Sequence, residues 1–313
     1  MKPRVRLCWP LVILIALTVP LVGAVAAENA EEVLRLGIVT DVHAHDTDSP
    51  REPGGAKVMT NYADRLGAFI TAMNDWPADL IIQLGDLVNG RYVSGAPLGE
   101  PERIPGILEA ADRICAGFEG PRYHVVGNHD VYDLSKQEIL EILGIASTSY
   151  SFDAGAYHMV VLDAQYERSG KDYGHIGWMV QGTIPRAELD WLEADLAATD
   201  KPTIVCTHQP LDSSFSLLAG GPPVSNHLEV QEILAAPGTV IAVFQGHTHE
   251  NGHTEIDGIH YVTFAAMVEE FSDSDGTAPT WAHVTLDPVA RTITIDGVGI
   301  QASIALSYTA AEE

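Results

Sequence analysis

The feature that most constrains the fold of this sequence is a repeated one: an apolar run followed at once by side chains that can bind a metal ion. Short apolar runs of this kind are typical of buried strands. The polar ends of five such runs, in chain order, are DVH (41–43), GDLVN (85–89), GNHD (127–130), TH (207–208) and GHTH (246–249). Ligands of open α/β sheets bind beyond the carboxyl ends of the strands. We therefore expect these side chains to gather on one rim, although they are far apart in the chain.

Helical patterns separate these runs, and the chain ends in β structure. Residues 62–76 and 186–199 carry apolar side chains at helical spacing, whereas the region 259–299 consists of short β-like runs. Strands that alternate with helices and are followed by hairpins predict an α/β sandwich, in which helices pack outside mostly parallel sheets. Two further segments, 165–183 and 212–226, carry aromatic, glycine and proline residues and are candidate walls of a pocket.

The N-terminal segment has the three parts of a secretory signal peptide. Basic residues precede an apolar run from Trp9 to Val22, and Ala-Val-Ala follows at positions 24–26. An uncleaved membrane anchor is the alternative, but the apolar run is short for a membrane span. We therefore expect a signal peptide over residues 1–26 and one domain over residues 27–313. The mature protein would be secreted or periplasmic and would have no membrane span.

The composition bears on the partners. The 313 residues include 17 basic and 43 acidic ones, for a formal net charge of −26. Such a surface repels polyanions, so we do not expect binding to a nucleic acid polymer. A protein of this charge that handles phosphate needs positive charge from a source other than lysine and arginine. Cys115 and Cys206 could form one disulfide, but two buried thiols are the expectation. The sequence leaves the oligomeric state open.

The residue types at the strand ends indicate the kind of metal. They supply carboxylate oxygens, imidazole nitrogens and one amide oxygen, from Asp41, His43, Asp86, Asn128, His208, His247 and His249. A mixed nitrogen and oxygen set suits Mn²⁺, Fe or Zn²⁺ better than Ca²⁺ or Mg²⁺, which favour oxygen alone. These seven ligands exceed the need of one tetrahedral ion and suit two divalent ions that share a carboxylate. Two such ions would also supply the missing positive charge.

The five motifs, in this order, resemble those of the calcineurin-like metallophosphoesterase superfamily, from about residue 34 to about residue 300. The resemblance implies a four-layer α/β/β/α sandwich of two mixed sheets with flanking helices. It also implies two divalent ions, with Mn²⁺ as the first choice, that share Asp86. Asp41, His43 and His249 would complete the first ion site. The second would be completed by Asn128, His208 and His247.

The resemblance also implies roles in catalysis. His129 corresponds to the family histidine that contacts the phosphate and assists the leaving group, and Asn128 lies beside it. Asp86 and His129 are therefore the candidate catalytic residues, and a hydroxide that bridges the two ions would attack phosphorus in line. The implied activity is hydrolysis of small phosphodiesters, diphosphates or phosphomonoesters, so the expected partner is a small phosphorylated substrate.

Further residues narrow the branch of the superfamily. Asn89 stands where purple acid phosphatases have tyrosine, and GDLVNGR and GNHD differ from the GDxxDRG and GNHE of Ser/Thr protein phosphatases. The segments 150–165 and 184–196, followed by GHTHENGH, are more similar to the manganese-dependent ADP-ribose/CDP-alcohol diphosphatase-like branch and to cyclic-nucleotide phosphodiesterases.

Other residues and one other function stay open. Tyr173, His175 and Trp178 could stack on a substrate base or sugar, or could cover an edge of the core. His45 is expected in a solvated loop, and Asp163 is expected to form a structural hydrogen bond rather than to act directly. A catalytically idle periplasmic protein that binds metal or phosphate on the same fold is the alternative function. The intact motifs favour the hydrolase, because loss of a site usually begins with a lost ligand.

Overall fold

The structure is a computed structural model that describes residues 32–47, 59–90, 92–93, 96–97, 101–173, 181–213, 222–268 and 279–309. The expected signal peptide over residues 1–26, His175 and Trp178 lie outside these ranges. Within the ranges, none of the helices combines the length and the apolar character that crossing a bilayer requires. Cys115 and Cys206 are both free and buried, as the sequence predicts.

The first sheet combines a parallel centre with an antiparallel wing. Its strand order is β14-β13-β12-β1-β2-β5. β1, β2 and β5 run parallel, and β12 joins β1 in the antiparallel sense. The strands are β1 (Leu34–Val39), β2 (Leu80–Gln83), β5 (Arg122–His124), β12 (Trp281–Asp287), β13 (Thr292–Val298) and β14 (Ile304–Ser307).

The second sheet is parallel except for its two edge strands. Its order is β10-β11-β9-β8-β7-β6, with β6 and β10 antiparallel to their neighbours. The strands are β6 (Tyr150–Ala154), β7 (Tyr157–Val161), β8 (Thr203–Cys206), β9 (Val240–Gln245), β10 (Gly252–Ile256) and β11 (Ile259–Thr263). A separate two-stranded ribbon pairs β3 (Tyr92–Val93) with β4 (Ala96–Pro97).

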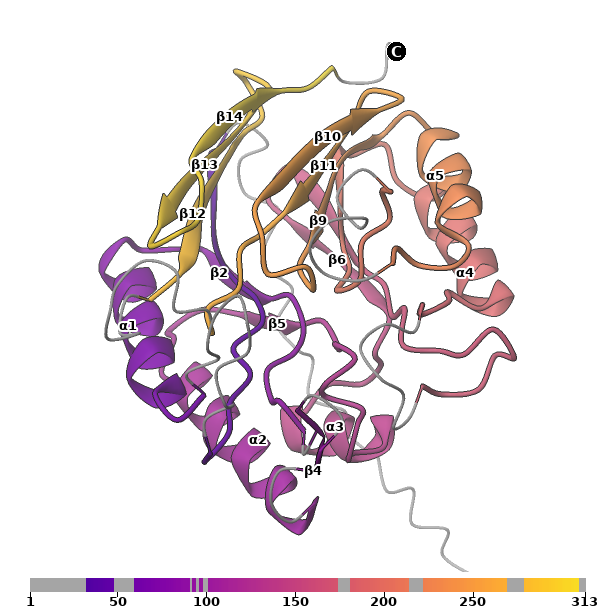
Figure 1. Ribbon diagram of the computed structural model, residues 1–313. Coiled ribbons are helices and arrows are strands. Elements are labelled where there is room, and N and C mark those ends of the chain that lie inside the picture. The colour runs from indigo at the N-terminus through magenta and orange to yellow at the C-terminus, as the bar shows by residue number, and fades with distance from the viewer. Residues whose placement is uncertain are drawn as a thin grey trace, which may run out of the picture.

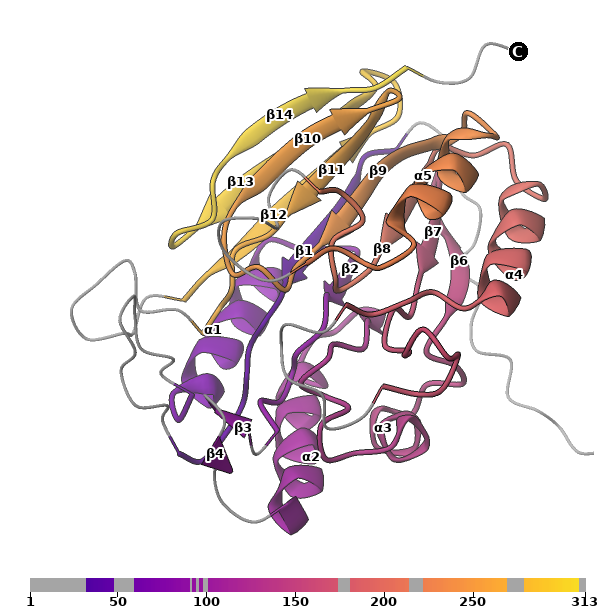
Figure 2. The same cartoon turned by 45° about the vertical axis from the view of Figure 1, so that its right-hand side comes forward.

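Helices cover the outer faces of both sheets, which gives the four layers that the sequence predicts (Figure 1). The first sheet carries α1 (Tyr62–Asp75) and α2 (Ile104–Cys115), which follows a short 3-10 helix (Pro101–Arg103). The second sheet carries α4 (Arg186–Leu196) and α5 (His227–Ala235). Figure 2 shows the two sheets packed face to face between these helix pairs, with α3 (Lys136–Leu143) below them.

Three apolar clusters explain why the strands read as continuous apolar runs. Between the sheets, side chains such as Ile38, Ile82 and Phe244 form the central core. Ile81, next to Ile82, instead packs in the cluster under α1 and α2, and Val243 packs in the cluster under α4 and α5. Because the central strands are buried on both faces, both sets of alternating side chains must be apolar. Polar side chains are thereby confined to the strand ends.

Candidate metal centre

The five polar strand ends meet at one rim of the sandwich. Asp41 and His43 follow β1, Asp86 follows β2 and Asn128 follows β5, all in the first sheet. His208 follows β8, and His247 and His249 follow β9, in the second sheet. The second sheet thus contributes nitrogen ligands alone, whereas the first contributes the oxygen ligands together with His43. The predicted convergence is present in the geometry.

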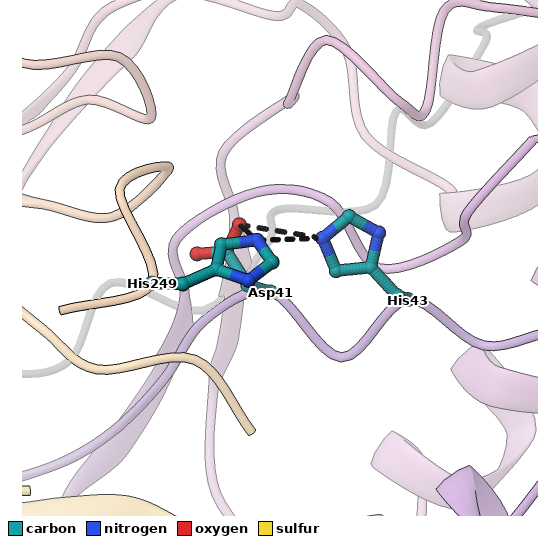
Figure 3. Close-up of side chains that lie close together, drawn as sticks. All are labelled: Asp41, His43 and His249. Atoms are coloured by element: carbon teal, nitrogen blue, oxygen red, sulfur yellow. Dashed lines mark hydrogen bonds and ion pairs between the residues drawn. The ribbon is translucent and has the colours of Figure 1, made fainter. Parts of the chain in front are cut away.

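Two groups of these residues lie within metal-binding distance of one another. Asp41, His43 and His249 form one group, and Asp86, His208 and His247 form the other, each with ligand atoms within 4.8 Å. Figure 3 shows His43 and His249 directed toward each other, with the Asp41 carboxylate beside the His249 ring. Their Nε2 atoms are 3.1 Å apart, and His249 Nε2 is 3.2 Å from Asp41 Oδ1.

Asp86 lies between the two groups. Its Oδ2 is 3.6 Å from His43 Nε2 and 3.2 Å from His208 Nε2. A third group of ligand atoms within 4.8 Å joins His43, Asp86 and His129. A carboxylate in this position could bind an ion on either side, and its role as the shared ligand stays a prediction.

Several atoms of the centre are buried without a hydrogen-bond partner. They are Asp41 Oδ1, Asn128 Oδ1, His208 Nε2 and His247 Nε2. A buried polar atom that lacks a partner costs about 1–3 kcal/mol, and such atoms are rare in folded proteins unless water or an ion completes them. Divalent cations accept these donor types, so the residues present fit the metal ions that the sequence predicts.

The backbone of the centre lies in an uncommon conformation. In the described ranges, seven residues other than glycine have positive φ, and five of them are predicted ligands. These five are Asp41 (51°), His43 (47°), Asp86 (55°), His247 (70°) and His249 (63°). Residues with a Cβ atom adopt this region at an energetic cost, and such strain gathers at functional sites.

Two glycines allow the strand ends to approach closely. A Cβ atom on Gly127 would lie 2.1 Å from Asp86 Oδ1, and one on Gly85 would lie 2.3 Å from His208 Nδ1. Gly85 also has a φ of 101°, which favours glycine. The glycines of the GD and GNHD motifs are therefore required by the contact between ligands from different strands.

Oxygen acceptors orient three histidine rings. His208 Nδ1 donates to Leu84 O at 2.8 Å, and His43 Nδ1 donates to Asn89 Oδ1 at 2.8 Å. The backbone oxygen of Asn89 also accepts from His129 Nδ1 at 2.7 Å. Such contacts fix the tautomer, so that Nε2 is the nitrogen that could bind a metal ion in His43 and His208. In the sequence, Asn89 distinguishes this chain from purple acid phosphatases, but its orienting role was not predicted; the signal for that role is the amide three residues after Asp86.

Asp130 ties two of the ligand turns together. Its carboxylate accepts from the backbone N–H groups of Asp86 (2.9 Å), Val88 (3.0 Å) and Gly127 (2.8 Å). Burial and the nearby Asp86 charge raise the pKa of Asp130 to about 7. The backbone N–H of His129 in turn donates to Asp86 Oδ1 at 2.7 Å. The last residue of GNHD is thus a support for the turn, a role that the motif alone did not reveal.

Burial and charge set the protonation of the histidines. Burial and the neighbouring His208 lower the pKa of His247 to about 3, so this ring is neutral near neutral pH. Burial also opposes charge on His208, but Asp86 and Asp41 raise its pKa to about 9. Burial would raise the pKa of Asp41, but His249 and His208 hold it well below its usual range. A divalent cation would take the place of the protons that balance these carboxylates.

Two other candidates are buried. His45 is 1% exposed and accepts a hydrogen bond from Thr47 N at 3.0 Å, so the predicted solvated position is wrong. Tyr173 is 2% exposed, and burial together with the Tyr132 and Asp86 charges raises the pKa of its hydroxyl. Tyr173 packs in the apolar cluster under α1 and α2 and so has no open ring face.

Comparisons with known proteins agree with this geometry. Residues 34–251 match the calcineurin-like phosphoesterase family. A manganese-dependent ADP-ribose/CDP-alcohol diphosphatase of Oryza sativa subsp. japonica is 25% identical over 300 residues, which cover 79% of this chain and 87% of that protein. A 3',5'-cyclic-nucleotide phosphodiesterase of Nostoc sp. is 23% identical over 252 residues, which cover 80% and 84%.

The solved structure of a dimetal phosphatase from Danio rerio has a TM-score of 0.71 at 18% sequence identity and covers 88% of this chain and 99% of its own. This likeness confirms the fold that the sequence predicts. The family match contains all five strand ends, from Asp41 to His249. The chain belongs to the calcineurin-like phosphoesterase family and is a phosphoesterase, that is, a hydrolase of phosphoric esters.

Proposed function

We propose that this protein is a binuclear metal-dependent phosphoesterase that hydrolyses small phosphodiesters and diphosphates, with phosphomonoesters as further substrates. The observation that carries the proposal is the set of buried atoms that lack partners, on Asp41, Asn128, His208 and His247. These atoms belong to ligands from both sheets, and Asp86 lies between the two groups at 3.2–3.6 Å.

The residues divide the work as follows. Divalent ions held by the seven ligands would supply Lewis-acid activation of the phosphate and of a water molecule. Asp86 holds the two halves of the centre together. His129 has its Nδ1 bonded to Asn89 O, and its ring meets His43 edge-on at 4.6 Å. His129 Nε2 is then the atom that contacts the phosphate and gives a proton, or stabilises charge, at the leaving oxygen.

The relatives support the substrate class and the metal. Two of them are named as an ADP-ribose/CDP-alcohol diphosphatase that depends on manganese and as a cyclic-nucleotide phosphodiesterase. We extend a small nucleotide-like phosphodiester or diphosphate and Mn²⁺ to this chain. The net charge of −26 agrees with a small substrate, since a long polyanion would be repelled.

A catalytically idle binding protein is not favoured. Binding of metal alone would place no demand on His129, yet both its backbone N–H and its ring are fixed, by Asp86 Oδ1 and Asn89 O. We keep export as part of the proposal, because the basic start, apolar run and Ala-Val-Ala of residues 1–26 support a cleaved signal peptide.

The test combines metal counting with kinetics. Metal-free protein is titrated with Mn²⁺, bound ions per chain are counted, and hydrolysis is measured on bis(p-nitrophenyl) phosphate, ADP-ribose, CDP-choline, cyclic AMP and p-nitrophenyl phosphate. We expect two ions per chain and turnover of diesters or diphosphates. Asp86→Asn should bind fewer ions and lose turnover, whereas His129→Ala should keep its metal and lose roughly 10²–10⁴-fold in kcat on cyclic AMP, whose leaving group is an alkoxide.

Asp195→Asn is the matched control, because this carboxylate lies at the other end of the second sheet and bonds His158 at 2.9 Å. It should retain both metal and turnover. Full turnover by Asp86→Asn, or two bound ions without turnover of any ester, would overturn the proposal.

A further inference from the structure

Lys136 joins the two halves of the molecule near the centre. It is the first residue of α3 and is 8% exposed. Its ammonium nitrogen lies 2.7 Å from Asp163 Oδ2 and 3.2 Å from Asp172 Oδ1, and it sits 3.0 Å from the centre of the Tyr166 ring. All three partners come from the segment that follows β7 in the second sheet, whereas α3 follows β5 and the GNHD turn of the first.

Stability alone does not account for a lysine in this place. A cation in the first turn of a helix opposes the helix dipole, which favours negative charge there. A buried ion pair also costs desolvation energy that an apolar pair of similar size would not. Asp163 is fully buried, and its Oδ1 accepts from Gln165 N at 2.8 Å, so the pair is held on both sides. Burial would lower the pKa of Lys136, but the Asp163 charge raises it, so the lysine stays charged.

The segment that Lys136 holds reaches the catalytic histidine. Asp172 precedes Tyr173, whose backbone N–H donates to Gln165 O at 2.9 Å. The Tyr173 side chain lies in the same apolar cluster as Val131 and Leu134, which follow the GNHD turn, and Ile139 of α3. The Tyr132 ring meets the His129 ring edge-on at 4.6 Å. Lys136 thus holds the 163–173 segment against the start of α3, close to the turn that carries His129.

We propose that Lys136 and Asp163 are positioning residues for His129: their ion pair locks the 163–173 segment against α3 and so sets the place of the imidazole at the leaving group. This inference rests on the proposed function, in which His129 acts on the leaving oxygen. It gives Asp163 more than the structural hydrogen bond that the sequence predicts. A merely structural role would change folding and would leave the chemistry of the leaving group as it is.

The experiment compares two diesters in Mn²⁺-loaded protein, one with a p-nitrophenyl leaving group and one with an alkyl leaving group. Poor leaving groups need His129, and p-nitrophenolate does not. Lys136→Met/Asp163→Leu removes both charges, so that no buried charge is left unpaired and the protein can fold. We expect roughly a tenfold loss of kcat on the alkyl ester, about unchanged kcat on the p-nitrophenyl ester, and unchanged Mn²⁺ binding.

Three comparisons make the result specific. In a His129→Ala background the double substitution should add no further loss, because both changes act through one group. Lys136→Arg keeps the charge and should retain most of the wild-type ratio between the esters. Lys201→Met is the matched control, since it removes a lysine 2.8 Å from Asp153, at the opposite end of β7. It should leave both rates unchanged.

An equal loss on both esters, or a loss that adds to that of His129→Ala, would overturn this inference and leave the proposed function standing. Wild-type protein that hydrolyses no ester with any metal would overturn the proposed function and this inference together.

Discussion

The second sheet carries a histidine–carboxylate cluster at each end, and the two differ in how their atoms are satisfied. At the amino end of β7, His158 Nδ1 is 2.8 Å from Asp153 Oδ1, and Nε2 is 2.9 Å from Asp195 Oδ2. Ser151 and Lys201 donate to the remaining oxygens of these carboxylates at 2.6 and 2.8 Å. At the opposite rim, His208 Nε2, His247 Nε2 and Asp41 Oδ1 lack a hydrogen-bond partner.

Residue types therefore do not distinguish the two clusters. The cluster around His158 is closed, because each polar atom finds a protein partner, and it joins β6, β7 and α4. The cluster at the rim is open, because the three atoms just named are buried without a hydrogen-bond partner and could bind a metal ion. The two clusters therefore differ in whether their histidine and aspartate atoms have partners, and not in the density of these residues.

Metal removal should separate the two clusters most clearly. A chelator should abolish hydrolysis, and adding Mn²⁺ back at about 100 times its dissociation constant should stabilise the fold by about 2.7 kcal/mol. Urea unfolding with and without Mn²⁺ measures this difference. Equal free energies of unfolding in the two conditions would contradict an open cluster that takes up metal.

Gly127→Ala should damage the open cluster without touching the closed one. The added Cβ atom would lie 2.1 Å from Asp86 Oδ1 and must displace the carboxylate. We expect Mn²⁺ affinity to fall by roughly 10–100-fold, as measured by calorimetry. Gly67→Ala is the control, because nothing lies within 4 Å of the added atom in the middle of α1. Wild-type affinity in Gly127→Ala would show that the close approach is unimportant.

His158→Gln tests the closed cluster. Loss of the ring leaves two carboxylates with fewer partners, so the free energy of unfolding should fall by about 1–3 kcal/mol, while Mn²⁺ binding stays as in the wild type. His247→Gln should show the reverse pattern in metal-free protein, with little loss of stability and with loss of metal. Similar effects of the two substitutions on stability and metal would erase the contrast between the clusters.

Glu188 lies on α4, which also supplies Asp195 to the closed cluster. Burial and the Asp163 charge raise the pKa of Glu188 to about 8. The folded state therefore keeps a proton that the unfolded chain loses near pH 4.3, so this group makes stability fall as pH rises between about 4.3 and 8. Glu188→Gln should flatten that decline in metal-free protein, measured by urea unfolding at pH 5, 6.5 and 8. Parallel curves for the two proteins would rule this out.

The fold and the gathering of the predicted ligands at one rim follow from the sequence for a simple physical reason. Strands buried on both faces need uninterrupted apolar side chains, so the first polar residues after β1 or β9 mark the strand end and the rim at once. Seven ligands could be placed in this way because each lies within a few residues of such an end. The helical pattern of 186–199 likewise predicts α4, which spans Arg186–Leu196.

The supporting contacts could not be predicted in this way, because they depend on packing between distant segments. Asn89 serves two rings through its side chain and its backbone, and Asp130 serves three backbone N–H groups on two turns. The pairing of Lys136 with Asp163 crosses from one sheet layer to the other. His45 lies two residues after His43, in a stretch expected to be a solvated loop, yet the fold buries its side chain. Local sequence patterns do not show which distant segments come into contact.

The origin of the ligands in two sheets has a consequence for the whole sandwich. An ion in either group would bind side chains from both sheets, so metal binding would depend on how one sheet lies against the other. A slide of the layers, even one caused by repacking around Phe244 deep between them, would move imidazole nitrogens relative to carboxylate oxygens at both ion positions together. Metal affinity would thus depend on core packing, so a metal-binding assay would detect substitutions far from the rim that shift the layers.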